Sequence, residues 1–125
     1  MFGLKSKNNE TVSFYQLTLH IGRGTNTEMP EELLGAYVPV FVVAENHEVA
    51  AEKAVSKLVQ QGYKFINIEG QIVQLDPLKW DAYVQEAWPE FQGHFPDQNK
   101  IIAGLKTENI FYGPFAGYDT PATNK

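Results

Sequence analysis

Hydrophobic and polar side chains alternate along residues Thr11 to Ile21. The apolar positions are Tyr15, Leu17, Leu19 and Ile21, and the polar positions between them are Gln16, Thr18 and His20. Successive side chains of a strand point to opposite faces, so this alternation is typical of a strand with one face buried. The segment therefore predicts a half-buried first strand.

A strand–helix–strand unit is the best-defined part of the pattern. Ala36 to Ala44 is apolar at almost every position, which predicts a strand buried on both faces, and Pro39 indicates a bulge or an outward-facing position near its start. His47 to Gln61 then has helical spacing, and Tyr63 to Leu75 is extended again.

The helix between these strands has signals at both ends. Asn46 can cap its first turn, Lys57 lies in its last turn, and Gly62 suits the backbone conformation that ends a helix. Its expected buried stripe consists of Ala51, Ala54, Val55, Leu58 and Val59.

A second helix is predicted after Leu75. Asp76 and Pro77 are suited to the N-cap and the first helical position, and Pro89 ends the pattern. The stripe of this helix is largely aromatic, at positions Trp80, Tyr83, Val84, Ala87 and Trp88.

The remaining segments are less regular. The connection from Gly22 to Gly35 is long. Loops of this length are more often functional or mobile than tight hairpins are. After a loop over residues 89–99, Lys100 to Lys106 and Ile110 to Phe115 predict two more strands, joined by a turn at residues 107–109.

This element order predicts the α+β class, with a mainly antiparallel sheet and two helices on one of its faces. Gly70 leaves two possibilities for Tyr63 to Leu75, a bulge in one long strand or a hairpin turn. With a turn, Ala36 to Lys106 has the ferredoxin-like order, with one extra strand at each end. We expect one domain over residues 1–118 and a disordered tail over residues 119–125.

Composition argues against several classes of function. Asp and Glu number 15 against 10 Lys and Arg, and Arg23 is the one arginine, so the basic patch that nucleic acids require is not expected. The apolar run Val38 to Ala44 is far shorter than the ~20 residues of a membrane-spanning helix, and the N-terminus lacks an apolar signal segment. The absence of cysteine fits a reducing compartment. We expect a soluble, cytoplasmic protein that binds neither nucleic acid nor membrane and has no cofactor.

One short motif suggests catalysis. The segment Phe91-Gln92-Gly93-His94-Phe95-Pro96 resembles the GHFP motif of the hot-dog-fold 3-hydroxyacyl-carrier-protein dehydratases, and the resemblance covers these six residues. It implies that His94 is a base and that Glu108, 14 residues later, handles the leaving hydroxyl. The alternative is a structural loop in which Phe91 and Phe95 anchor the chain to the core and His94 is exposed.

Two other groups of residues have chemistry suited to a binding site. Gly22 to Asn26 could form an anion-binding nest with Arg23 as a clamp, or a flexible turn, and Glu28 and Glu31 nearby would repel a phosphate. The three histidines, His20, His47 and His94, do not have the spacing of a metal site, and no metal is expected.

The aromatic residues suggest an interface. Trp80 and Trp88 can belong to the core or can be exposed anchors at a partner surface, where tryptophan is enriched. Tyr112 and Phe115 lie in the last predicted strand, which could pair with a second subunit if it is an edge of the sheet.

These observations favour a small, acidic, non-catalytic protein-interaction module that self-associates or inhibits a basic partner. A structural component of a larger assembly would have the same aromatic surface. The alternative from a different class is a small-ligand-binding or enzyme domain, with a pocket near His94, Glu108 and Tyr112 and with Arg23 at its rim.

Overall fold

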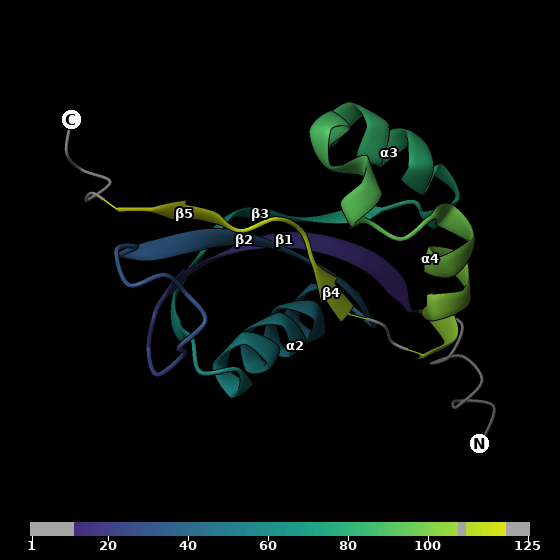
Figure 1. The fold of residues 1–125 in the computed structure, drawn as a ribbon. Helices are drawn as coiled ribbons and strands as arrows, with labels where there is room; N and C mark the ends of the chain where they lie inside the picture. The colour runs from purple at the N-terminus through teal and green to yellow at the C-terminus, as the bar shows by residue number, and fades with distance from the viewer. Residues whose placement is uncertain (1–11, 108–109, 120–125) are drawn as a thin grey trace, which may run out of the picture.

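The computed structural model describes residues 12–107 and 110–119. Its centre is an antiparallel sheet with the strand order β3-β1-β2-β4, in which β5 also pairs with β2 (Figure 1). The strands are β1 (Ser13–Gly22), β2 (Gly35–Ala44), β3 (Lys64–Leu75), β4 (Ile110–Tyr112) and β5 (Ala116–Tyr118). The short strands β4 and β5 lie one after the other along the same edge of β2, beside residues 40–42 and 35–37 respectively. The α+β class predicted from the sequence is confirmed.

The helices lie on two sides of the sheet, which differs from the expectation that both lie on one face. Figure 1 shows α2 (His47–Gln60) below the sheet and α3 (Trp80–Ala87) above it. The short helix η1 (Pro77–Lys79) leads into α3, and η2 (Pro89–His94) leads to α4 (Gln98–Gly104) at the end of the sheet. The physical reason is β2, which is apolar and buried on both faces and therefore needs cover on both.

Two hydrophobic clusters fill the two sides. The cluster under α2 joins Ala50, Ala54 and Leu58 of the helix to alternate residues of β1 and β2. The cluster on the other face is largely aromatic, and its buried members are Phe14, Phe41, Val43, Trp80, Val84, Phe95 and Ile101. Successive residues of a strand point to opposite faces of the sheet. Neighbouring side chains of β1 therefore belong to different sides, and only those on the same face share a cluster.

The predicted ends of the first two helices are confirmed. The Asn46 side chain accepts a hydrogen bond of 2.9 Å from the amide of Val49, and Gly62 has φ of +94° just after α2. The Asp76 side chain caps η1, with Pro77 at its first position. Among the described residues, no helix is both long and apolar enough to cross a membrane.

The strand predicted at Lys100 to Lys106 is wrong, because residues 98–104 form α4. The Asp97 side chain accepts a hydrogen bond from the amide of Lys100 and caps this helix, and Ile101 and Gly104 are buried one helical turn apart. The ferredoxin-like order is therefore not confirmed. Residues 120–125 of the predicted tail and Glu108 lie outside the described residues.

Gly70 is a bulge rather than a hairpin turn. It lies inside β3 with φ of +70°, and the register with β1 shifts nearby, since Gln16 is opposite Val73 whereas Thr18 is opposite Glu69. A step of two residues along β1 is thus matched by a step of four residues along β3, and the strand continues to Leu75. Glycine suits this position because other residues rarely adopt a positive φ.

Candidate functional site

One half of the upper sheet face has no described helix over it. The aromatic cluster with α3 covers the end that carries Phe14, Phe41 and Val43, and Figure 1 shows β5 along the other end. We call this second half the open sheet face, formed by Thr18, His20, Tyr37, Asn67, Glu69 and Tyr118. The register places these residues together, because residues opposite one another on neighbouring strands share a face.

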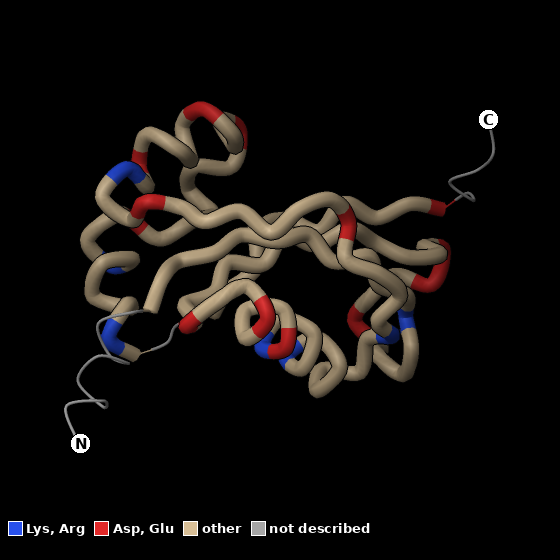
Figure 2. Tube along the Cα trace, turned by 180° about the vertical axis from the view of Figure 1, so that it is seen from behind, with Lys and Arg blue, Asp and Glu red and all other residues tan. Residues whose placement is uncertain are grey.

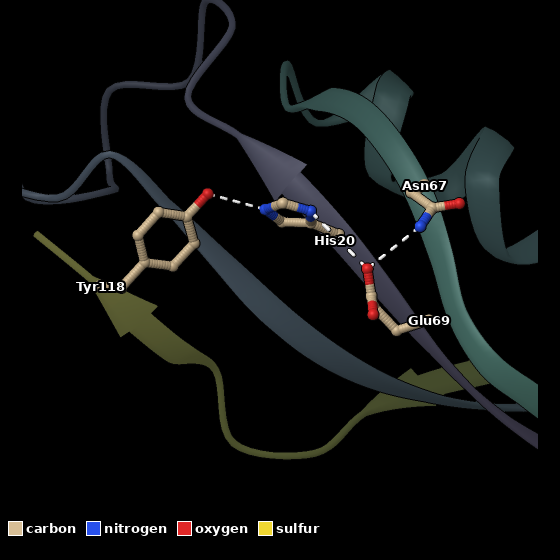
Figure 3. Close-up of polar contacts among 4 residues, drawn as sticks. All are labelled: His20, Asn67, Glu69 and Tyr118. Atoms are coloured by element: carbon tan, nitrogen blue, oxygen red, sulfur yellow. Dashed lines mark hydrogen bonds and ion pairs between the residues drawn. The ribbon is translucent and has the colours of Figure 1, made fainter. Parts of the chain in front are cut away.

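A chain of polar contacts crosses the open sheet face. The Tyr118 hydroxyl lies 2.7 Å from Nε2 of His20, and Nδ1 of His20 lies 3.9 Å from Oε2 of Glu69 (Figure 3). Asn67 donates a hydrogen bond of 3.0 Å to the same Glu69 oxygen. The His20 ring also stacks on Tyr37, with ring centroids 4.5 Å apart. With its proton on Nδ1, the nitrogen that faces Glu69, His20 can accept the hydrogen bond from Tyr118.

The outer side of β3 is a free edge of the described sheet, since β1 is its only described neighbour. Phe65 and Ile66 are 37% and 45% exposed on this edge, and Val73 is 45% exposed beyond the bulge. Lys64 and Glu69 are the only Lys, Arg, Asp or Glu residues in the five described strands. Figure 2 shows the other charged residues of the described ranges on helices and loops instead of on one face.

Arg23 holds the connection between β1 and β2 in place. Its guanidinium donates to the carbonyl of Met29, and also to those of Pro30 and Leu33 at 2.7 and 3.1 Å. The loop is also tied to the end of α2, because the Asn26 side chain donates a hydrogen bond of 2.6 Å to the carbonyl of Gln61. The recorded hydrogen bonds of Arg23 all go to backbone oxygens of this loop, and the anion-binding nest stays a prediction.

A cavity of about 510 Å³ lies between this loop, the end of α2 and the last strands. We call it the Tyr112 pocket, and its walls include Glu28, Met29, Leu33, Gln61, Tyr63, Tyr112 and Phe115. The Tyr112 hydroxyl donates a hydrogen bond of 2.9 Å to Oε1 of Gln61. Burial, and to a lesser extent the negative charge of an ionised Tyr63, raises the pKa of Tyr112 to about 12, so this phenol is neutral at physiological pH.

The structure brings two of the predicted binding residues together and separates the others from them. Tyr112 and Phe115 share the Tyr112 pocket, with ring centroids 5.8 Å apart. Arg23 contributes to this pocket only by holding the loop that forms part of its wall. Tyr63 and Glu28 also line this pocket, but Tyr63 lies just before β3 and Glu28 lies in a loop, and neither position carries a motif that would reveal it in the sequence.

Trp80 is a core residue, so its assignment to a partner surface is corrected. It is 1% exposed, and its Nε1 donates a hydrogen bond of 2.8 Å to the carbonyl of Pro96. Its ring is enclosed by those of Phe14, Phe41 and Phe95. Trp88 is half-buried beside Phe95, and its Nε1 lies 3.4 Å from the hydroxyl of Tyr83.

The GHFP segment belongs to η2 and the turn after it. Phe95 is 8% exposed and anchors the segment to the aromatic cluster, whereas Phe91 is 43% exposed. His94 is exposed, and its Nε2 lies 3.3 Å from the carbonyl oxygen of Tyr112. Glu108, the proposed partner of His94, lies outside the described residues, so the pair is not defined by this structure.

His20, Tyr37 and Tyr118 were not singled out as site residues from the sequence. Alternation placed His20 on the polar face of its strand, but it could not show that Tyr118 lies across from it.

Comparison of this chain with protein-family models, with curated proteins and with solved structures finds no match.

Proposed function

We propose that this chain is a non-catalytic protein-interaction module that self-associates through the outer edge of β3. The observation that supports it is the exposed edge itself, a strand of 12 residues with Phe65 and Ile66 exposed on it. A free strand edge presents unpaired amide and carbonyl groups and can add another strand. The Gly70 bulge disturbs the middle of this edge, and a second register shift with β1 lies between Phe65 and Asn67. The proposed pair uses the segment Lys64 to Glu69, in which this second shift places both end residues on the same face.

The sequence of this segment favours a second copy of the same chain as the partner. In a two-fold antiparallel pair centred between Ile66 and Asn67, Lys64 of each copy lies opposite Glu69 of the other. Both residues lie on the upper face, since their partners in β1 are Gly22 and Thr18. A cross-strand pair of opposite charges contributes roughly 0.2–1 kcal/mol, and the symmetry supplies the pair twice.

The other proposals make different demands on the surface. Inhibition of a basic partner would use acidic charge gathered on one face, whereas the described acidic residues other than Glu69 are spread over helices and loops (Figure 2). A component of a larger assembly would use the same β3 edge against a different chain.

A cytoplasmic location, which the cysteine-free composition favours, belongs to the same proposal.

Sedimentation velocity with charge variants tests the proposal. The wild-type chain should form a dimer, and Glu69→Lys should dissociate it because two lysines then face each other at each end of the pair. The double variant Lys64→Glu/Glu69→Lys should restore the dimer by exchanging the charges. Glu86→Lys, which makes the same charge change on the exposed surface of α3, is the matched control and should leave the dimer intact.

A wild-type chain that sediments as a monomer at every concentration would reject self-association. A dimer that Glu69→Lys leaves unchanged would place the interface elsewhere on the molecule and would also contradict the proposal.

A further inference from the structure

Three aromatic rings meet in the Tyr112 pocket, those of Tyr112 and Phe115 near the end of the chain and that of Tyr63 just before β3. Phe115 lies between the other two, with ring centroids 5.7 Å from Tyr63 and 5.8 Å from Tyr112. The planes of these pairs are inclined at 49° and 78°, so the rings form walls that face different directions. Three inclined rings present several π-faces, which carry partial negative charge, to one volume.

The pocket carries negative charge in addition to these rings. Glu28 lies in its wall, and neither lysine nor arginine is among the described residues that line it. The negative charge of Glu28 acts on the Tyr63 ring, since it raises the pKa of that phenol after the larger effect of burial. Arg23 is the one Lys or Arg residue of the loop, and its recorded hydrogen bonds go to backbone carbonyls.

We propose that the Tyr112 pocket binds a small organic cation of the quaternary ammonium type, with Tyr63, Tyr112 and Phe115 in contact with its methyl groups and Glu28 as its counter-charge. Aromatic faces attract such cations through their quadrupole, and a quaternary ammonium is easier to remove from water than a primary one. Met29 and Leu33 supply apolar surface for the rest of the molecule. The volume of about 510 Å³ lies within the ordinary range of small-molecule sites, roughly 300–1,000 Å³.

The loop that carries Glu28 is held by hydrogen bonds within the protein, which favours binding. The amides of Glu28 and Met29 donate to Oδ1 of Asn26 at 2.8 and 3.1 Å. On the opposite wall, the hydrogen bond from Tyr112 to Gln61 holds the Tyr112 ring. A preformed site loses less conformational entropy on binding than a mobile one.

Titration with choline, followed by the NMR signals of the aromatic side chains, tests the proposal. The matched probe is 3,3-dimethylbutan-1-ol, which has the shape of choline but a carbon atom in place of the charged nitrogen. We expect choline to shift the signals of Tyr63, Tyr112 and Phe115 in a saturable manner and to bind about tenfold more tightly than the neutral probe. Equal affinities, or no saturable shift with choline, would overturn the proposal.

Variants separate charge from shape at the site. Glu28→Gln should weaken choline binding several-fold and leave binding of the neutral probe unchanged, whereas Glu32→Gln, an exposed change in the same loop, should alter neither. Phe115→Leu keeps apolar volume but removes a ring, so it should weaken choline more than the neutral probe. Losses that are equal for both probes would show a site selective for shape only, and would reject the cation as its ligand.

Discussion

His20 and Tyr118, which are 98 residues apart in the chain, are joined by a hydrogen bond of 2.7 Å between Nε2 and the phenol oxygen. This contact fixes β5, a strand of three residues that also pairs with β2. Ring contacts of His20 and Tyr118 with Tyr37 add to it. A short terminal strand has few backbone hydrogen bonds of its own, so side-chain contacts decide whether it stays on the sheet.

Tyr118→Phe should lower the free energy of unfolding by about 1 kcal/mol, because it removes this hydrogen bond and keeps the ring. Urea unfolding followed by circular dichroism measures the change, and hydrogen exchange should show faster exchange in β5 than in the wild type. Tyr37→Phe is the matched control and should have a smaller effect, since it also keeps its ring and the Tyr37 hydroxyl has no hydrogen bond to the described residues. Equal effects of the two substitutions would mean that the Tyr118 hydroxyl does not hold β5.

Arg23→Lys should also destabilise the protein, although it keeps the positive charge. The guanidinium reaches three carbonyls of the loop, whereas an ammonium on a flexible stem cannot reproduce this planar arrangement. We expect a loss of about 1–2 kcal/mol in the free energy of unfolding. Limited proteolysis should cleave the variant faster between Gly24 and Gly35. If Arg23→Lys is as stable as the wild type, the charge alone holds the loop.

The two tryptophans should respond very differently to replacement by alanine. Trp80→Ala should cost about 3–5 kcal/mol, because it empties the centre of the aromatic cluster and leaves the carbonyl of Pro96 without its donor. Trp88 is half-buried, so Trp88→Ala should cost about 1–2 kcal/mol. Urea unfolding of both variants measures the difference. Similar losses would contradict the placement of Trp80 in the core.

Local patterns in the sequence were enough to identify much of this fold. The capping residues Asn46 and Asp76 and the alternation in β1 act within a few residues, so they could be recognised without knowledge of the rest of the chain. Residues 98–104 show the opposite case, because Ile101 and Ile102 suit a strand or a helix and the Asp97 cap decides the outcome. The positions of α2 and α3 on opposite faces depend on long-range packing, which no local pattern encodes.

The candidate sites were harder to predict than the elements. Tyr112 and Phe115 were singled out as aromatic residues of a late strand, but their neighbours Tyr63 and Glu28 come from distant segments. The contact between His20 and Tyr118 likewise depends on where β5 pairs. Such sites arise from tertiary structure, and residue spacing along the chain does not reveal them.

The ionisation of Tyr112 makes stability depend on alkaline pH. Its pKa is raised from 10.0 to about 12 in the folded protein, so the unfolded chain loses this proton first as the pH rises. The stabilisation is complete below pH 10 and should be lost progressively between pH 10 and about 12.

Absorbance of tyrosinate as a function of pH checks this behaviour. A late tyrosinate step near pH 12 is expected from Tyr112, and Tyr112→Phe should remove that late step. Tyr37→Phe should leave the late step in place. A late step that survives in Tyr112→Phe would assign it to another tyrosine and contradict the burial of this phenol.

The most direct test of self-association through β3 is amide hydrogen exchange at several protein concentrations. In a β3–β3 pair, amides of Lys64 to Glu69 that do not bond to β1 become hydrogen-bonded to the second copy. Their protection should increase with protein concentration in the wild type and should not do so in Glu69→Lys. Rapid exchange of these amides at every concentration, alongside stable protection of β1, would contradict the account.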